Sequence, residues 1–304
     1  MKSNTAVIKV LYNKIKIDHD EVDKICTAYK YYLIINNSSC TVGNQNIDVS
    51  NFKIINNFNS NGLSGAYNLG ISSLIKIDPK FVLFLDDDTN TNHLYNLYDE
   101  LFYSDFENTN VAAIAPMYID SNSNTRGSHI LLSRFSFKRI PRNYKGIYNV
   151  SFMINSSSVW RFDALKKIGK FDECMKVDLI DTDYCLRAIE SGYSIIMNSN
   201  YLFVHTIGNR ISYRFLFKKF RSGNHSPERR KMIMMNNVII LRKHFFKYPI
   251  LLIVILSRII YEFLGIILAE SSKNEKLIYS FKGLLIGMFK PLEHCYEKKY
   301  FVLV

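Results

Sequence analysis

Short apolar runs alternate with stretches of helical periodicity along the first two thirds of the chain. Strands are predicted, in order, at Ala6–Leu11, Tyr31–Ile35, Phe52–Ile55, Phe81–Leu85 and Val111–Ala115. Helices are predicted between them, one with Asp18 as its N-cap and Val22 and Ile25 on its apolar face, and one over Leu63–Ile75. This βαβ rhythm predicts an α/β fold, in which a mixed, mainly parallel sheet carries helices on both faces.

Polar residues follow several of these strands at the point where each strand ends. Tyr12 and Asn13 come after the first strand, and Asn36 after the second. Asp86–Asp88 directly follow the strongly apolar run at 81–85. Because ligands of open parallel sheets bind beyond the carboxyl ends of the strands, this edge is the candidate site. The alternative for the acidic triplet is a solvated turn.

A second acidic cluster, KVDLIDTDYCLRA, contains Asp178, Asp181 and Asp183 and is followed by Arg187. Adjacent carboxylates repel one another, and a bound cation relieves that repulsion. Carboxylate oxygens suit Mg²⁺ and Mn²⁺, and such an ion commonly joins protein carboxylates to substrate phosphates. The alternative is a helix N-terminus rich in acidic residues, which the helix macrodipole favours.

Composition divides the chain into two regions. Of its 304 residues 48% are hydrophobic, which is enough for a sizeable core, and five cysteines without CxxC spacing favour free thiols. Residues 1–205 hold 21 basic and 21 acidic residues, whereas 206–304 hold 18 and 6, so the net charge of +12 lies in the second region. We predict a catalytic domain over 1–208 and a basic, mostly helical region over 209–304 with an anionic partner.

The second region contains one strongly apolar stretch, PILLIVILSRIIYEFLGIIL at 249–268. Its length could span a bilayer, but Arg258 and Glu262 in mid-segment are costly in lipid. We therefore expect a helix at the membrane interface or in a groove, beside Lys and Arg residues that attract anionic lipid. A helix packed on the catalytic domain is the alternative, and YSFKGLLIGMFKP is a candidate for a second such helix.

Seven short segments occur in an order typical of one enzyme family. They are VIKVLYN, IINNSS, NSNGLSGAYNLGI, LFLDDDT, INSSSVWRFDALKKIGKFDE, VDLIDTDYCLRAIESGY and HTIG. Together they resemble the inverting family 2 glycosyltransferases of the GT-A fold, and most of all the bacterial rhamnosyltransferases and galactofuranosyltransferases of surface-polysaccharide assembly. The resemblance covers most of the chain and implies a Rossmann-like domain that binds a nucleotide sugar.

The resemblance also implies roles for individual residues. Asp86 and Asp88 would form the DxD pair that holds the nucleotide and, with His205, a Mg²⁺ or Mn²⁺ ion; a satisfied histidine at a strand end is the alternative for His205. Asp181 would be the catalytic base. The residues implied on the nucleotide-sugar side are Tyr12, Asn13, Asn36, Asn68, Asp86, Asp87 and Asp88. Those implied on the acceptor side are Asp183, Arg187, Arg230 and Asn237.

The expected function is sugar transfer, with L-rhamnose from dTDP-rhamnose as the first candidate and UDP-galactofuranose as the second. The expected acceptor is a saccharide on polyprenyl diphosphate, in O-antigen or capsule biosynthesis, at the cytoplasmic face of the bacterial inner membrane. The non-enzymatic alternative is a membrane- or nucleic-acid-binding protein on a decayed transferase fold. Nucleic acid is not an expected partner, because the basic region has aliphatic stretches and no recognisable binding motif.

Overall fold

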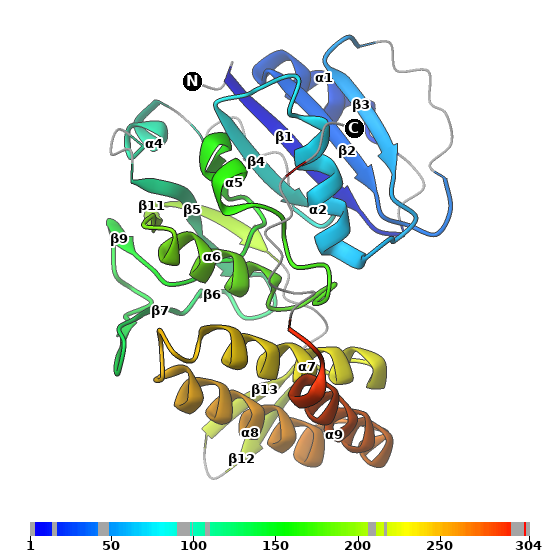
Figure 1. The fold of residues 1–304 in the computed structure, drawn as a ribbon, viewed down its shortest axis with the longest axis vertical. Helices are drawn as coiled ribbons and strands as arrows, with labels where there is room; N and C mark the ends of the chain where they lie inside the picture. The colour runs from blue at the N-terminus through cyan, green and yellow to red at the C-terminus, as the bar shows by residue number, and fades with distance from the viewer. Residues whose placement is uncertain are drawn as a thin grey trace.

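The protein consists of an α/β domain and a layer of three long helices (Figure 1). The computed structural model describes residues 4–13, 17–41, 49–89, 98, 100–106, 110–205, 211–215, 218–292 and 301. The strands are β1 (Thr5–Leu11), β2 (Tyr31–Asn36), β3 (Phe52–Asn56), β4 (Phe81–Asp86), β5 (Val111–Asp120), β6 (Thr125–Arg126), β7 (His129–Leu132), β8 (Phe137–Ile140), β9 (Ile147–Asn149), β10 (Val159–Arg161), β11 (Ser194–His205), β12 (Ile211–Phe215) and β13 (Lys218–Ser222). The helices are α1 (His19–Ala28), α2 (Gly62–Ser73), α4 (Glu100–Ser104), α5 (Phe162–Ile168), α6 (Ile180–Glu190), α7 (Pro227–His244), α8 (Leu251–Ala269) and α9 (Lys273–Phe289).

One sheet organises the α/β domain. Its strands lie in the order β3-β2-β1-β4-β10-β5-β11-β9, and β6 pairs with β5. The strands β1 to β4 run parallel to one another, as do β5 and β11. Between these two parallel groups, β10 is antiparallel to both β4 and β5. The predicted α/β class with a mixed, mainly parallel sheet is therefore confirmed, and each of the five predicted strands is present.

The apolar runs become central strands because both of their faces are covered. In β4, Phe81, Leu83 and Leu85 contribute to a hydrophobic cluster with α1 and α4, whereas Val82 and Phe84 contribute to a second cluster with α2, α5 and α6. All five side chains are buried. A strand buried on both faces needs an unbroken apolar run, so the polar residues that end this run mark the edge of the sheet.

The N-terminus of α1 shows how local chemistry starts a helix. The Asp18 carboxylate accepts hydrogen bonds from the backbone N–H groups of Asp20 and Glu21, at 3.0 and 3.4 Å, so two unpaired donors of the first turn are satisfied. Val22 and Ile25 then lie buried on the sheet. The predicted cap and apolar face are both observed.

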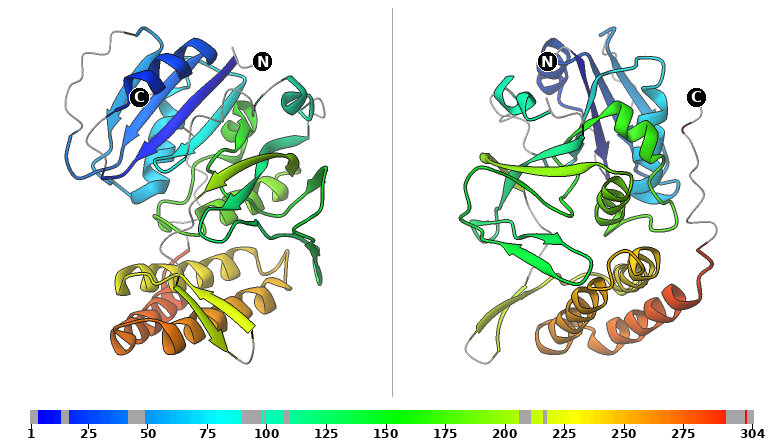
Figure 2. Two further views of the ribbon diagram at one scale, coloured as in Figure 1. Left: turned by 180° about the vertical axis from the view of Figure 1, so that it is seen from behind. Right: turned by 60° about the vertical axis from the view of Figure 1, so that its left-hand side comes forward.

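Helix α7 joins the two regions of the chain. Its Ile239 and Ile240 belong to the same hydrophobic cluster as β4, α2 and α6. The helices α8 and α9 lie beyond α7, at the end of the molecule farthest from the sheet (Figures 1 and 2). The predicted boundary between residues 208 and 209 falls outside the described residues; the sheet ends at His205, and the β12–β13 hairpin starts at Ile211.

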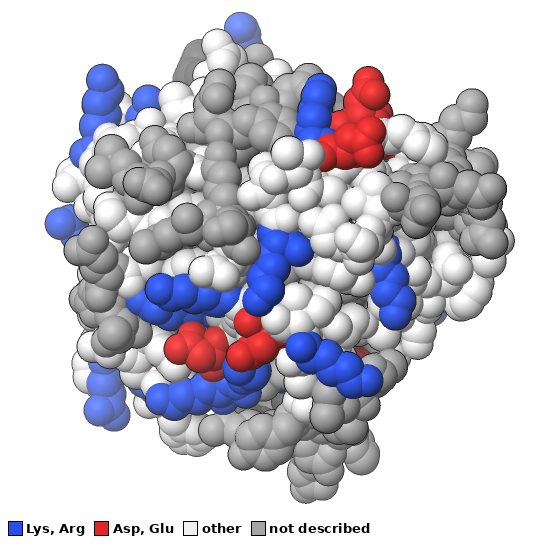
Figure 3. Space-filling view, turned by 90° about the horizontal axis from the view of Figure 1, so that it is seen from above, with Lys and Arg blue, Asp and Glu red and all other residues white. Residues whose placement is uncertain are grey.

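The orientation of the sheet decides on which side the candidate site lies. The carboxyl ends of β1 and β4 point toward the helical layer, so the candidate site lies on that side (Figure 1). At the opposite end of the α/β domain, the described residues in Figure 3 include Lys and Arg side chains spread among uncharged residues, with a few carboxylates.

Candidate active site

The acidic triplet lies in a tight turn at the carboxyl end of β4. The backbone N–H of Asp86 donates to Thr89 Oγ1 at 3.1 Å, and the N–H of Thr89 donates to the Asp86 carbonyl at 3.2 Å. Thr89 is also hydrogen-bonded to the Ser156 hydroxyl at 2.7 Å. The turn is thus fixed on a rigid central strand and on the segment that precedes β10.

Asp86, Asp88 and His205 form a candidate metal centre. Their ligand atoms all lie within 4.8 Å of one another, and His205 Nδ1 is 3.8 Å from Asp88 Oδ1. His205 Nδ1 is buried and has no hydrogen-bond partner among the described residues. Two carboxylates and an imidazole with an unused nitrogen fit a divalent cation such as Mg²⁺ or Mn²⁺. Asp87 is not part of this group.

The electrostatics of this turn also favour a cation. Burial raises the pKa of Asp86 to about 6; the charge of His205 lowers it, and that of Asp88 raises it. The Tyr67 hydroxyl, which comes from α2, donates to Asp86 Oδ1 at 3.1 Å. Burial also raises the pKa of Tyr67 well above its usual value, so this hydroxyl stays protonated and remains a donor.

Asp181 lies in the first turn of α6, on the side of Asp86. Its Oδ2 accepts the backbone N–H of Asn155 at 3.3 Å, and its buried Oδ1 has no hydrogen-bond partner among the described residues. Burial and, to a smaller extent, the charge of Asp86 together raise the pKa of Asp181 to about 7. A carboxylate with an open oxygen and a pKa near neutrality can accept a proton from a bound hydroxyl.

Two residues of this site, Tyr67 and Asn155, were not assigned a role from the sequence. Asn155 is 1% exposed, and neither of its side-chain amide atoms makes a hydrogen bond to another described residue. The next turn is constrained, because Ser157 has φ 62° while its N–H donates to the Phe84 carbonyl at 2.8 Å. The available signal was the polar run NSSS at 155–158, directly before the buried strand β10.

The residues predicted on the nucleotide side differ in how accessible they are. Tyr12 is 52% exposed beyond β1, and the N–H of Asn13 donates to Ser38 Oγ at 2.8 Å. Asn36 is fully buried; its side-chain amide donates to the Cys40 carbonyl and to Asn56 Oδ1, both at 2.8 Å. The Asn36 amide is therefore engaged within the protein, and it shapes this loop.

Asn68 also has a different environment from the one predicted. It is 3% exposed, and its side-chain amide donates to the Phe171 carbonyl and to Glu173 Oε1, while its Oδ1 accepts the N–H of Phe171 at 2.8 Å. All of these bonds join α2 to the segment before α6. The prediction that Asn68 contacts the nucleotide sugar receives no support from this arrangement.

Of the four residues predicted on the acceptor side, Asp183, Arg230 and Asn237 are buried and Arg187 is half-buried. Asp183 is 1% exposed, with Lys243 Nζ at 2.6 Å and His244 Nε2 at 3.1 Å from its Oδ1, and Arg187 donates to the carbonyls of Lys170 and Ile168. These two residues tie α6 to α7 and to the end of α5. Both side chains therefore have internal partners, and their role on the acceptor side stays a prediction.

Arg230 and Asn237, both on α7, are likewise internal. Arg230 is fully buried, in contact with the carboxylates of Glu262 and Glu270, and Asn237 donates to the Ile233 carbonyl one turn earlier. Long-range ion pairs of this kind satisfy the charge of a buried guanidinium. The contacts of Arg230 and Asn237 therefore give no support to a role in acceptor binding.

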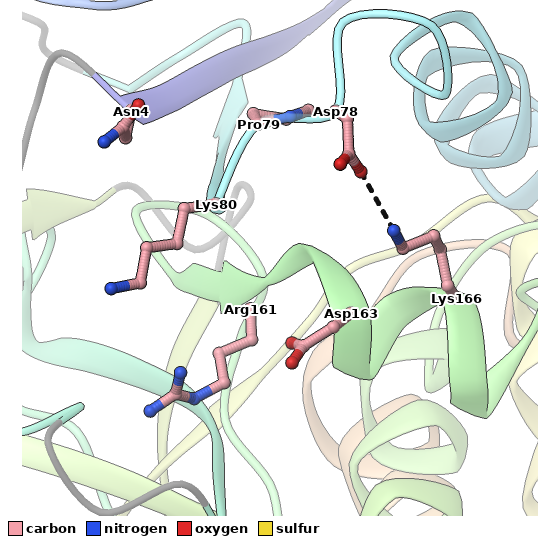
Figure 4. A pocket seen from close by; sticks show the side chains of 7 residues that line it. All are labelled: Asn4, Asp78, Pro79, Lys80, Arg161, Asp163 and Lys166. Atoms are coloured by element: carbon pink, nitrogen blue, oxygen red, sulfur yellow. Dashed lines mark hydrogen bonds and ion pairs between the residues drawn. The ribbon is translucent and has the colours of Figure 1, made fainter.

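A separate cavity of about 350 Å³ lies at the opposite end of the sheet. It is lined by residues at the start of β1 and β4 and the end of β10, and Figure 4 shows the ion pair of Lys166 with Asp78, at 2.9 Å, on one side of it. Because Lys80 precedes β4 and Asp86 ends it, this cavity is distinct from the carboxylate cluster.

Comparisons with known proteins bear on this site. No protein-family model matches the chain. The chain is 22% identical over 289 residues to dTDP-rhamnosyl transferase RfbF of Shigella flexneri, covering 94% of each chain. Its fold is similar to that of S. aureus TarS, residues 1–349, with a TM-score of 0.54 and 13% identity over 93% of this chain and 80% of that chain.

A further structure, GalNAc-T7 with UDP, GalNAc and Mn²⁺, matches with a TM-score of 0.49 and 13% identity over 78% of this chain and 47% of that chain. The mainly parallel sheet and the similarity to TarS define the fold of the protein. It is a GT-A fold, as the order of its sequence segments predicted, and over nearly its whole length the chain is similar to a dTDP-rhamnosyl transferase.

Proposed function

We propose that this protein is an inverting, family 2 glycosyltransferase that moves a sugar from a nucleotide-diphosphate donor to a saccharide carried by a lipid. The observation that carries the proposal is the convergence of two groups at the carboxyl edge of the sheet. One is the cluster of Asp86, Asp88 and His205, and the other is Asp181 with its open oxygen. The first suits a diphosphate, and the second suits a nucleophilic hydroxyl.

The metal would be held by Asp86, Asp88 and His205. When bound, a Mg²⁺ or Mn²⁺ ion supplies positive charge that neutralises the developing charge of the leaving diphosphate. The chain prepares this site with a fixed turn and with the Tyr67 hydroxyl, which orients Asp86 at 3.1 Å. A turn fixed before the ligand arrives needs little reorganisation during the reaction.

Asp181 is proposed as the catalytic base. It accepts the proton of the acceptor hydroxyl while that oxygen forms a bond to the anomeric carbon and the bond from this carbon to the leaving diphosphate breaks. One displacement at this carbon inverts its configuration. The backbone N–H of Asn155 holds Asp181 Oδ2, which leaves Oδ1 to receive the proton.

For the donor, dTDP-rhamnose is the first candidate and UDP-galactofuranose the second. The similarity to a dTDP-rhamnosyl transferase over 94% of the chain supports the first. Tyr12 presents an exposed aromatic ring next to the carboxyl end of β1, where a pyrimidine base can stack. The engaged amide of Asn36 lies deeper and is proposed to shape the base site from below.

The proposed acceptor is a growing saccharide on polyprenyl diphosphate, in O-antigen or capsule biosynthesis. The chain would act as a peripheral protein at the cytoplasmic face of the bacterial inner membrane. The basic C-terminal region and its apolar helix support this proposal, since anionic lipid attracts the first and takes up the second.

Transfer assays with a panel of nucleotide sugars test the proposal. With a synthetic lipid-linked saccharide and Mg²⁺, dTDP-rhamnose should give product, and nuclear magnetic resonance should show the inverted anomeric configuration. Asp181→Asn is the inactive control. Transfer from none of the donors, together with no affinity for dTDP or UDP, would refute a nucleotide-sugar transferase.

A further inference from the structure

The helical region buries several polar and charged groups and leaves large apolar side chains outside. Beside apolar side chains such as Ile239 and Ile266, its interior holds Ser222, Arg230, Glu270, Lys276 and Ser280, each at most 5% exposed. Its outer surface holds large apolar side chains that are 37–80% exposed: Leu252, Ile253, Leu256, Ile260, Tyr261, Leu264, Ile267, Leu268, Ile278, Phe281, Leu285, Ile286, Met288 and Phe289. We call these exposed side chains of α8 and α9 the apolar platform. A contiguous exposed apolar patch marks a surface that is covered by something other than water.

The side chains of the apolar platform belong to two helices that share one outer layer. Helices α8 and α9 lie together at the end of the molecule, and α7 separates them from the α/β domain (Figures 1 and 2). The rings of Phe263 on α8 and Phe281 on α9 are 5.1 Å apart, so the two helices are in direct contact. The platform is therefore one surface made by two helices.

Helix α8 is long and apolar enough to cross a membrane, with 19 residues and a mean hydropathy of 2.4. The contacts of its inner face, however, do not fit a helix that spans the membrane. Glu262 forms an ion pair with the buried Arg230 of α7, and Gly265 packs so closely on Ser222 of β13 that a Cβ atom there would clash with it. A spanning α8 would therefore bring α7 and the β12–β13 hairpin into the hydrocarbon.

That arrangement is physically unfavourable, because the neighbours of α8 are polar. Helix α7 carries Arg229, Lys231 and Arg242, and the β12–β13 ribbon has only two strands and therefore open edges. Charged side chains and open strand edges are not tolerated facing lipid acyl chains. One face of α8 is thus fixed on polar protein, and the opposite face is apolar and exposed.

The charges around the apolar platform are mainly positive. Exposed Lys247, Arg258, Lys273 and Lys282 lie on or next to α8 and α9, and within the described residues 245–292 Glu275 is the single exposed acid. Cations at the rim of an apolar helix face complement the negative surface of an anionic bilayer. A protein partner would require an acidic rim of matching shape. An anionic lipid surface requires only an exposed apolar face and a positively charged rim.

We propose that α8 and α9 lie together in the plane of an anionic lipid membrane, with the apolar platform among the upper acyl chains and α7 on the water side. The inference rests on the membrane attachment given under the proposed function and is independent of the donor and the chemistry. Because packed helices are about 8–10 Å apart, α7 forms a spacer of one helix between the lipid and the carboxyl edge of the sheet. The candidate catalytic site then faces the membrane, where the saccharide of the proposed acceptor is attached to its lipid.

Vesicle flotation tests the proposal with the full-length protein. The probe is a vesicle of phosphatidylethanolamine and phosphatidylglycerol, compared with phosphatidylcholine alone. Wild type should float with the anionic vesicles, in part even at high salt, and alkaline carbonate should release it. Ile267→Glu should weaken binding several-fold and Ile260→Glu/Ile267→Glu at least about tenfold, because each change removes buried apolar area. The matched control is Ile147→Glu on β9, since Ile147 and Ile267 are both 47% exposed.

The outcomes separate this inference from the proposed function. Affinity for dTDP with Mg²⁺, measured by calorimetry, should be the same in all four proteins. Equal flotation of wild type and the double variant would overturn the inference. Resistance to carbonate extraction would also overturn it, because it indicates a spanning helix. A third overturning result is that wild type binds no vesicles and sediments as a dimer, and that the variants are monomers. Vesicle binding without dTDP or UDP affinity would leave the inference standing and refute the proposed function.

Discussion

The α/β region and the helical region solve opposite problems with one chain. The first buries apolar strands such as β4 and places carboxylates at their ends, so its polar candidate site lies at the edge. The second buries Arg230 against Glu262 and Glu270 and leaves isoleucine, leucine and phenylalanine outside. This difference is the one expected if the first region faces water and the second faces lipid, as proposed above.

Helix α6 shows how the two regions are coupled. Asp181 in its first turn faces the carboxylate cluster, whereas Asp183, two residues later, faces α7 and pairs with Lys243. Residues two positions apart on a helix point in different directions, so one turn can serve both the proposed reaction and the junction. Variants at these two positions test whether chemistry and architecture separate in this way.

The largest effect is expected for Asp181→Asn. The amide keeps the shape and can still accept the N–H of Asn155, but it cannot take up a proton. Transfer should fall about 10²–10⁴-fold, the usual contribution of a general base, while affinity for the donor nucleotide and for vesicles stays normal. Single-turnover transfer and separate calorimetry measure this. Near-normal turnover of Asp181→Asn would refute its assignment as the base. If Asp183→Asn were then folded but inactive, the base would be assigned to Asp183.

The second effect concerns the junction rather than the reaction. Asp183→Asn removes the carboxylate charge shared by buried Lys243 and His244 and leaves them with Asp172 and Glu190, which should lower the free energy of unfolding by about 3 kcal/mol. Urea unfolding measures the change. The control is Asp23→Asn, at an exposed position on α1, which should have little effect. Equal stability of both variants would show that the Asp183 cluster does not hold the regions together.

A smaller effect is expected at the metal centre. Asp88→Ala should weaken dTDP binding about 10- to 100-fold when Mg²⁺ is present, the size of one lost contact to a charged group. Asp78→Ala, beside the cavity at the opposite end of the sheet, is the control and should bind normally. Isothermal titration with Mg²⁺ and with EDTA measures this. Equal affinity of wild type under both conditions would exclude a metal-dependent donor site.

The smallest effect is a pH dependence of stability. Burial alone lowers the pKa of His244, but hydrogen bonds with Asp183 and Glu190 outweigh it and raise the pKa above 6.5. Charged His244 therefore stabilises the fold below about pH 6.5, and this contribution is lost as the pH rises through the raised pKa. The stability difference between wild type and His244→Gln should shrink from pH 5.5 to pH 8.5. A constant difference would mean that His244 does not titrate in this range.

The general position of the candidate site follows from the sequence, but its detailed membership does not. The apolar run 81–85 predicts a buried strand, and the acids after it therefore had to lie at an edge. Asn36 and Asn68 also lie near strand ends or on α2, yet their amides are engaged with Cys40, Phe171 and Glu173. Whether a side-chain amide faces a ligand or the protein depends on partners far away in the chain.

The sequence by itself determined the α/β class, the carboxylates at the end of β4 and the apolar character of α8. Each of these is written in local periodicity and composition, which act over a few residues. Only the tertiary structure decided that Arg230 is internal, that the Asn155 amide has no partner among the described residues and that α8 presents its apolar face outward. Those outcomes depend on contacts between residues dozens of positions apart, such as Arg230 with Glu262, and a local pattern does not encode which partner a charge finds.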